Sequence, residues 1–230
     1  MKKFDRRSFL KTSSLSAAAI ASTSLLASCT PPKRTSKGTY MGGFAAPKIP
    51  NLRAAFIGVG ARGGDHLRVV ASMENTEVVA ISDLYEDHVE RWSQIASDIG
   101  KGERHQNVAS YFGGEDLWKK MLEEVKPDVV FIATNWENHA PMVIQAMKSG
   151  AHAFVEVPIA TTLEAMWEIV HTSEETQKHC MMMENVNYGR TELMYLNMCR
   201  QGVIGDLLHG EAAYIHELRF QMEEQERGTG

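Results

Sequence analysis

The sequence predicts an α/β protein built on a doubly wound parallel sheet. From residue 52 onward, short runs of β-forming residues alternate with amphipathic helical stretches, a pattern typical of parallel strands with helices on both faces. The runs are nearly continuous in apolar residues, as expected for strands that are covered on both sides. With 230 residues, 43% of them hydrophobic, the chain is long enough for one full domain core and part of another.

Apolar runs and helical periodicity predict the elements in chain order. We expect strands over residues 52–57, 77–81, 128–133, 151–155 and 179–183. We expect helices over residues 63–73, 86–99, 115–125, 139–149, 162–177 and 191–201. Thr162 is a candidate N-cap, and Gly150 and Gly202 stand where C-terminal caps belong. Residues 101–114 are predicted to form a loop, in which Tyr111 is a candidate for a short strand.

A last run, over residues 206–221, alternates its side chains in the manner of a long strand. It has no partner strand in this sequence, and a strand with unpaired backbone groups at its edges tends to pair with other chains and aggregate. We therefore expect the doubly wound domain to occupy residues 51–178. Residues 179–230 would be the start of a second, α+β open-sheet domain, in a chain that is truncated.

Residues 1–29 are predicted to be a targeting signal and are left out of the fold. Arg6 and Arg7 stand in a basic segment that resembles the twin-arginine motif, and a small-residue apolar run follows over residues 15–27. That run is too short to span a membrane as a helix. The twin-arginine route carries folded proteins, which suits a protein that takes a bound cofactor out of the cytoplasm. We expect export to the periplasm.

Cys29 ends a Leu-Ala-Ser-Cys segment that resembles a lipobox. The resemblance implies that Cys29 carries a lipid and that the mature protein is a membrane-anchored lipoprotein. An ordinary free cysteine near a signal-peptidase site is the alternative. Residues 30–50 are rich in Pro, Gly, Ser and Lys, a composition that predicts a flexible linker.

Charge and cysteine spacing exclude several classes of function. A formal net charge of −5 and a pI near 6.0 argue against a nucleic-acid partner, which would need clustered Lys and Arg. The spacing of Cys180 and Cys199 fits neither a metal site nor a redox motif. We expect both thiols to be buried, and Trp167 and residues 181–183 to pack in the core.

Gly58, Gly60 and Gly63 form a Gly-x-Gly-x-x-Gly element directly after the first strand and before a helix. In this setting the first glycine permits a tight turn, the second lets the backbone approach a pyrophosphate, and the third allows close helix packing. Ala61 and Arg62 lie between them, where the helix amino terminus would face the phosphates. The element predicts a Rossmann-type dinucleotide-binding domain; a glycine-rich turn without a ligand is the alternative.

Asp83 stands at the end of the next strand, 83 minus 63, or 20, positions after the last glycine. An acidic residue near this spacing accepts hydrogen bonds from the adenosine ribose. Its carboxylate would repel a 2′-phosphate, so the sequence favours NAD over NADP as the cofactor. Arg62 blurs this preference, because a guanidinium beside the site could contact a phosphate.

Three polar loops follow successive predicted strands. In open parallel sheets, ligands bind at the carboxyl ends of strands, so we include these loops in the cofactor site. Each loop taken alone is more simply explained as a polar connection. The residues that we assign are Trp136, Glu137, Asn138 and His139 after the third strand, Glu156 and Val157 after the fourth, and Asn185 after the fifth.

These residues, with three further segments, resemble the Gfo/Idh/MocA oxidoreductases and, within that family, glycoside hydrolase family 109. The resemblance covers roughly residues 52–219, and its most specific stretches are residues 179–192, 200–205 and 214–219. Sugar dehydrogenases of the wider family usually carry Glu-Lys-Pro where this chain has Glu-Val-Pro at residues 156–158. The family-109 glycosidases resemble it with valine.

The valine changes the chemistry that the resemblance implies. A lysine with a depressed pKa can take a proton from a hydroxyl, whereas Val157 can only line the nicotinamide face. Other groups must then transfer protons, and the resemblance implies that Tyr214 binds the sugar while His216 or Tyr188 is the catalytic base. Tyr214 and His216 share one face of the predicted strand; sheet-face residues bonded to neighbours are the alternative.

The implied activity is a glycosidase that uses NAD without net redox change, by oxidation, elimination, water addition and reduction. The expected substrate is an α-linked N-acetylgalactosaminide or a related glycan. An exported NAD-dependent sugar or cyclitol oxidoreductase and a non-catalytic sugar-binding relative are the alternatives. We expect no metal and no nucleic-acid partner. The sequence is compatible with a homo-oligomer.

Overall fold

The computed structural model describes residues 38–185, 187–213, 215 and 217. Its strands are β1 (Leu52–Ile57), β2 (Thr76–Asp83), β3 (Ala109–Phe112), β4 (Val129–Ile132), β5 (His152–Glu156) and β6 (Cys180–Met183). Its helices are α2 (Ala61–Ser72), α3 (Glu86–Ile99), α4 (Leu117–Val125), α5 (Trp136–Lys148), α6 (Leu163–Thr176) and α7 (Arg190–Arg200). The strands and helices expected up to residue 201 are present, with ends that differ by a few residues.

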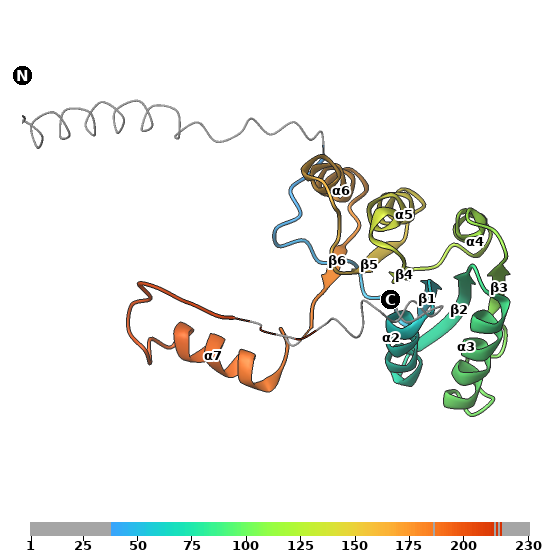
Figure 1. Ribbon diagram of the computed structural model, residues 1–230, viewed down its shortest axis with the longest axis horizontal. Coiled ribbons are helices and arrows are strands. Elements are labelled where there is room, and N and C mark those ends of the chain that lie inside the picture. The colour runs from blue at the N-terminus through green and yellow to red at the C-terminus, as the bar shows by residue number, and fades with distance from the viewer. Residues whose placement is uncertain (1–37, 186, 214, 216, 218–230) are drawn as a thin grey trace, which may run out of the picture. The chain divides into compact units, whose positions relative to one another are not determined.

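All six strands run parallel in one sheet, in the order β3-β2-β1-β4-β5-β6 (Figure 1). The chain steps outward from β1 to β3 and then crosses back, so that β4 pairs with the other side of β1. The strand order therefore reverses between β1 and β4. In sheets of this kind, ligands bind in the crevice at that point, outside the carboxyl ends of the strands.

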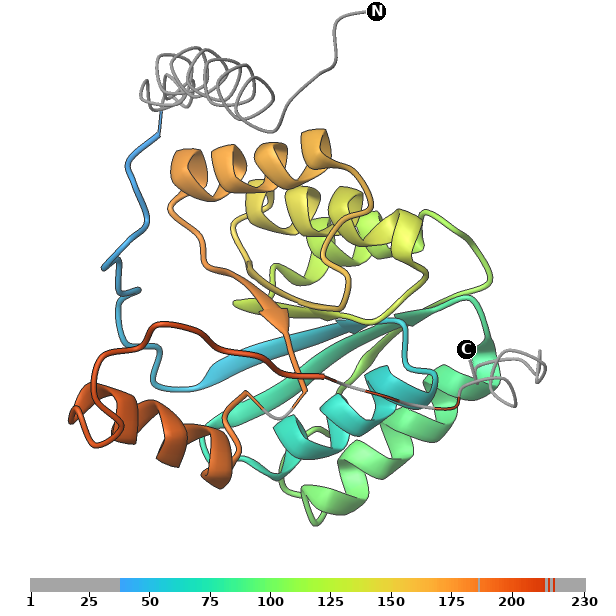
Figure 2. The same ribbon diagram turned by 60° about the vertical axis from the view of Figure 1, so that its left-hand side comes forward.

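Helices cover both faces of the sheet, as Figure 2 shows. On one face, α2 and α3 bury Leu67 and Trp92 in a core with β1 and β2. On the other face, α4 and α5 bury Met121 and Val143 in a second core. Because inner strands such as β1 and β4 contribute side chains to both cores, their sequences are continuously apolar. The predicted doubly wound fold is confirmed.

β3 is a complete strand where the sequence suggested a loop with one candidate strand residue. It pairs with β2 along Ala80 to Asp83. β3 is the edge strand on this side of the sheet, and its four side chains alternate between half-buried and exposed. An edge strand therefore lacks the continuous apolar run by which the inner strands were found.

The long strand expected over residues 206–221 is wrong for the part that the structure describes. Residues 206–213 form no strand and their side chains are exposed. An isolated strand has no neighbour to satisfy its backbone groups, and none of the described strands pairs with this segment. α7, which precedes it, buries no residue.

Several residues that were expected to be buried are not. Met181 and Met182, on the edge strand β6, are 36% and 37% exposed. Trp167, on α6, is 49% exposed. Their assignment to the core is wrong. Cys180 and Cys199 are half-buried rather than buried. Partial burial still raises the pKa of the Cys180 thiol to about 12, so this thiol stays protonated at neutral pH.

The segment before β1 lies against β6 and α6. The Thr39 amide donates to the carbonyl of Glu174 at 3.1 Å, and the Ala46 amide donates to Nε2 of His179 at 3.3 Å. This part of the predicted linker is held on the folded unit. β6, which lies beyond the predicted domain boundary at residue 178, belongs to the same sheet through its pairing with β5.

The predicted signal peptide, Cys29, Tyr214 and His216 lie outside the described residues. Within the part of the chain that is described, no helix is both long enough and apolar enough to cross a membrane.

Candidate functional site

A cavity of about 930 Å³ opens at the carboxyl ends of the strands. It is lined by the β1–α2 turn, the end of β2 and the loops that follow β3, β4 and β5. It therefore lies at the reversal of strand order between β1 and β4. Its volume falls at the upper end of the range for small-molecule and cofactor sites, roughly 300–1,000 Å³.

The glycine turn has the geometry that its spacing predicted. Gly58 has a φ of 80°, in the left-handed region that favours glycine. A Cβ on Gly58 would overlap the carbonyl of Ala133, and a Cβ on Gly63 would overlap the carbonyl of Gly58. Both positions therefore need glycine, the first for its conformation and the second for the close approach of α2 to the turn.

The amino terminus of α2 faces the cavity without a cap. Its N-cap residue is Gly60, which has no side chain to cap it, and its first turn contains no acidic residue. Gly60, Ala61 and Arg62 line the cavity. The first amides of a helix have no intrahelical acceptor and carry its positive dipole end, so this end of α2 is suited to an anion such as a pyrophosphate.

Asp83 ends β2 beside this turn. Its Oδ2 accepts a hydrogen bond from the Val59 amide at 2.8 Å, and its Oδ1 accepts from the Tyr85 amide at 3.0 Å. The carboxylate thus fixes the glycine turn to the end of β2, and it also lines the cavity. Each oxygen keeps a second lone pair, so Asp83 can still accept from a ribose hydroxyl.

Sequence reasoning missed one side of the cavity. Tyr85 and His88 line it after β2, and Gly114, Glu115 and Asp116 line it after β3. The signal was the rule that ligands sit beyond the carboxyl ends of strands. Residues 109–112 lack the continuous apolar run of the inner strands, so the sequence did not point to the loop after them.

The loop between β4 and α5 forms the middle of the cavity wall. α5 begins at Trp136, and the Asn138 side chain donates to Oδ1 of Asn135, its N-cap residue, at 2.6 Å. His139 is 1% exposed, and its ring nitrogens contact the carbonyls of Pro158 at 2.7 Å and Thr134 at 3.0 Å. His139 therefore joins the loops after β4 and β5 and leaves no ring nitrogen free for a ligand.

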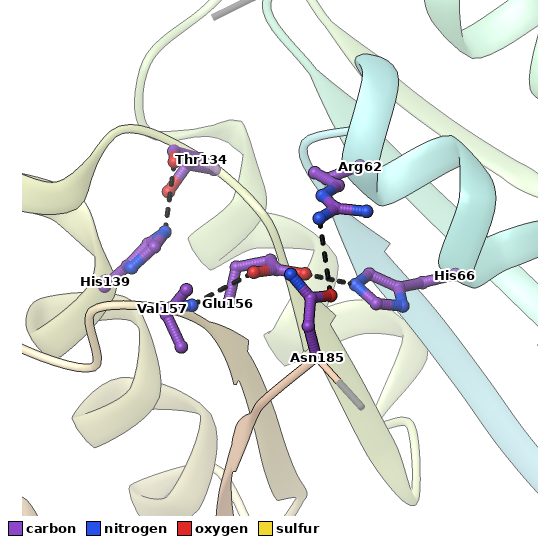
Figure 3. A network of polar contacts seen from close by, with 7 residues as sticks. All are labelled: Arg62, His66, Thr134, His139, Glu156, Val157 and Asn185. Carbon is purple, nitrogen blue, oxygen red and sulfur yellow. Dashed lines mark hydrogen bonds and ion pairs between the residues drawn. The ribbon is translucent and has the colours of Figure 1, made fainter. Parts of the chain in front are cut away.

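Glu156, the last residue of β5, forms polar contacts through both oxygens of its carboxylate (Figure 3). Its Oε1 lies 2.6 Å from Nε2 of His66 on α2, and its Oε2 accepts from the Val157 amide at 3.1 Å. The Glu156 side chain is 13% exposed and that of His66 is 28% exposed. Glu156 and Val157 line the cavity, and His66 is not part of its lining.

The structure brings most of the predicted cofactor residues together. Gly58, Gly60, Ala61, Arg62, Asp83, Trp136, Glu137, Asn138, His139, Glu156 and Val157 all line this one cavity. Gly63 packs behind the turn, and the Asn185 side chain accepts a hydrogen bond from Arg62 at 3.3 Å. Tyr188 is 74% exposed and is not part of the cavity lining.

The site has the parts that a dinucleotide needs. An uncapped helix terminus and a glycine turn suit the pyrophosphate, and a carboxylate at the end of β2 suits a ribose. Together with the strand order, these features define the class of the protein as a Rossmann-type dinucleotide-binding protein.

Comparison with known families agrees with this class. The oxidoreductase family with an NAD-binding Rossmann fold, Gfo/Idh/MocA, matches residues 52–184. The chain belongs to the Gfo/Idh/MocA oxidoreductase family, and NAD is the cofactor of its Rossmann domain. A second match, to the C-terminal domain of glycosyl hydrolase 109, covers residues 188–230.

Curated relatives carry the name of that glycosyl hydrolase family. Glycosyl hydrolase family 109 protein 1 of Akkermansia muciniphila is 55% identical over 199 residues, which are 86% of this chain and 40% of that protein. A family 109 protein of Shewanella pealeana is 48% identical over 230 residues, 99% of this chain and 50% of that protein. The chain thus spans about half the length of these relatives or less.

Solved structures share the fold at lower identity. Scyllo-inositol dehydrogenase from Lactobacillus casei, with NAD(H) and scyllo-inositol bound, matches with a TM-score of 0.58 and 18% identity, over 68% of this chain and 43% of that one. Myo-inositol 2-dehydrogenase from Lactobacillus plantarum matches with a TM-score of 0.56 and 24% identity, over 68% and 43%.

Proposed function

We propose that this chain forms part of a glycosidase of the family 109 type, which holds NAD in the cavity and uses it without net redox change. The observation that carries the proposal is Val157. It lines the cavity next to Glu156, at the position where the resemblance expects a proton-accepting lysine in a dehydrogenase. The names of relatives that are 48–55% identical support the same assignment.

In this proposal the chain's own residues bind and orient the cofactor. The turn at Gly58 and Gly60 and the first amides of α2 hold the pyrophosphate, and Asp83 accepts from the adenosine ribose. Val157 forms an apolar wall for the nicotinamide. Bound NAD supplies a reversible acceptor for a hydride, so that one cofactor serves many turnovers.

Proton transfer and sugar binding are proposed for residues toward the end of the chain. Tyr214 binds the sugar, and His216 or Tyr188 acts as a base. The exposure of Tyr188 in the described residues means that it would need another part of the protein, or the substrate, to bring it to the cavity. The substrate class is an α-linked N-acetylgalactosaminide or a related glycan.

The decisive experiment measures sugar release by the full-length protein from a chromogenic α-N-acetylgalactosaminide, with no added electron acceptor. Release should continue for many turnovers per bound NAD, and it should fall sharply in Asp83→Ala, which weakens the cofactor site. Strict dependence on an added acceptor would refute the proposal. Mass spectrometry of the denatured protein should find nucleotide; its absence would favour a non-catalytic sugar-binding role.

A second candidate is an NAD-dependent sugar or cyclitol oxidoreductase. The similarity in fold to inositol dehydrogenases favours it. Steady accumulation of NADH in the presence of a polyol would support this candidate, and a cofactor that stays bound and never turns over in bulk would count against it.

The proposal places the enzyme outside the cytoplasm. The twin-arginine motif at Arg6 and Arg7 and the lipobox ending at Cys29 support export, with a lipid anchor at Cys29. Replacing both arginines with lysine should leave the protein in the cytoplasm, as measured by cell fractionation. Cys29→Ala should release exported protein from the membrane fraction without blocking export.

A further inference from the structure

The contact between His66 and Glu156 connects two elements that are far apart in the sequence. The two residues are 90 positions apart, on α2 and at the end of β5, and their side chains meet at 2.6 Å. A distance of 2.6 Å is slightly shorter than the roughly 2.7–2.9 Å that is usual for a charge-assisted N–H···O hydrogen bond. The second Glu156 oxygen is held by the Val157 amide, so the carboxylate is fixed from both sides (Figure 3).

Few groups at this end of the cavity can take up a proton. Both ring nitrogens of His139 are engaged by carbonyls, and Val157 has no ionisable group. Arg62 also lines the cavity, but a guanidinium does not give up its proton in proteins. Glu137 also lines the cavity, on the exposed first turn of α5. Among the described residues at the end of β5, Glu156 is thus the carboxylate that lines the cavity and is largely buried, with 13% of its side chain exposed.

His66 gives the Glu156 carboxylate a route to solvent. His66 is more exposed than Glu156, at 28% against 13%, and it is not part of the cavity lining. An imidazole can accept a proton on one nitrogen and release one from the other. The pair therefore reaches from the cavity wall to the protein surface.

We propose that Glu156 is the proton acceptor for a hydroxyl bound in the cavity, which leaves the proton on the adjacent carbon to the base proposed at His216 or Tyr188. His66 is the positioning residue that fixes Glu156 and passes the proton to solvent. This inference rests on the proposed function, since oxidation of a hydroxyl must release a proton. The hydroxyl O–H bond breaks, its electron pair forms the carbonyl π bond, and the proton bonds to Glu156. The C–H bond on the same carbon breaks with it, and its electron pair leaves as a hydride, for which bound NAD would be the acceptor.

The test uses variants of the full-length protein that separate a hydrogen bond from a proton route. His66→Gln keeps a donor near Glu156 but cannot shuttle a proton, and His66→Ala leaves space for added imidazole. Asp65→Asn is the matched control, because Asp65 is the exposed neighbour on α2. Each variant is measured for kcat, KM and the Kd of NAD, and for release of sugar or formation of NADH, whichever the wild type shows.

We expect Glu156→Gln and His66→Ala to lower kcat by about 10²-fold or more, the usual contribution of a positioned acid or base. KM and the Kd of NAD should change by less than about threefold, since one good hydrogen bond to a ligand would cost roughly tenfold in affinity. Imidazole should restore kcat in His66→Ala. Wild-type kcat in His66→Gln, or no rescue by imidazole, would overturn the proton route.

A second readout does not depend on activity. In protein labelled with ¹⁵N-histidine, the ring nitrogen signals of His66 should change in Glu156→Gln and stay the same in Asp65→Asn. Unchanged signals in Glu156→Gln would overturn the pairing itself. If the wild type releases no sugar but forms NADH, the proposed glycosidase fails while the kcat comparison still decides the role of the pair.

Discussion

Two carboxylates stand at the ends of parallel strands on opposite sides of the crevice, and each faces a histidine. Asp83 ends β2 and lies 3.4 Å from Nδ1 of His88 on α3. Glu156 ends β5 and lies 2.6 Å from Nε2 of His66 on α2. The two sites look alike in composition but differ in what holds the carboxylate.

Asp83 is bonded through both oxygens to backbone amides, which do not exchange protons on the time scale of catalysis. The contact with His88, at 3.4 Å, is not a hydrogen bond. His88 Nδ1 is buried and has no hydrogen-bond partner among the described residues. Glu156 has one backbone amide and one histidine. The first arrangement suits fixed recognition of a ligand, and the second suits proton transfer.

The largest expected effect separates the two carboxylates by NAD affinity. Asp83→Ala should weaken NAD binding by about 1.5–3 kcal/mol, the range for charge-assisted hydrogen bonds, or roughly 10- to 150-fold in Kd. Isothermal titration calorimetry on the full-length protein measures it. Glu156→Gln is the matched comparison, and equal losses in both variants would show that the two carboxylates do not differ in role.

The next effect concerns the turn that Asp83 holds. Gly58→Ala should lower the free energy of unfolding by about 1–2 kcal/mol from the left-handed backbone alone, with more from the overlap of its Cβ with Ala133. Urea unfolding measures it. Gly113→Ala is the control, since Gly113 has a similar φ of 84° with nothing near its Cβ. A loss no larger than that of Gly113→Ala would mean that close packing at Gly58 does not matter.

Sequence spacing was sufficient for Asp83 but not for the partner of Glu156. The glycine element and an acid 20 residues later lie on one β-α-β unit, so local order along the chain places them in space. The contact of His66 with Glu156 depends instead on how α2 packs across the sheet toward β5. No periodicity or motif around His66 encodes a neighbour 90 positions away.

The edges of the sheet were harder to predict than its centre, for a related reason. β1 and β4 are covered on both faces and are read directly from their apolar runs. β3 and β6 are edge strands, where exposure depends on which other parts of the protein lie nearby. For that reason the sequence did not predict β3 as a full strand, and the predicted packing of Met181 in the core was wrong.

Acid should destabilise the fold through histidines that do not line the cavity. Burial lowers the pKa of His105 and of His152. A histidine whose folded pKa is below its unfolded value of about 6.5 stabilises the protein at higher pH, and this stabilisation is lost as pH falls below about 6.5. Urea unfolding at pH 7.5 and pH 5.5 should show the loss, and an NMR titration should show that both rings have a pKa below that of an unperturbed histidine.

Geometry gives the same sign for His105. Its Nδ1 accepts from the Val78 amide at 3.0 Å, which a protonated ring cannot do, while its Nε2 contacts the Ala71 carbonyl at 3.1 Å. The neutral ring with its proton on Nε2 satisfies both contacts. Stability that rises on acidification over this range would contradict the assignment.

The smallest effect is the sharpest test of the comparison. His88→Phe removes the buried Nδ1 that has no hydrogen-bond partner and keeps an aromatic ring edge-on to Tyr85, where the ring centroids are now 5.3 Å apart. Replacing an unsatisfied polar atom by an apolar group of similar shape is close to neutral, so the free energy of unfolding should change by less than about 0.5 kcal/mol. The Kd of NAD and kcat should both stay within about threefold.

A fall in kcat like that of His66→Ala would mean that His88 acts on Asp83 as His66 acts on Glu156. Both carboxylates would then depend on their histidines for catalysis. The two backbone amides that donate to Asp83 would not give it a different role from Glu156.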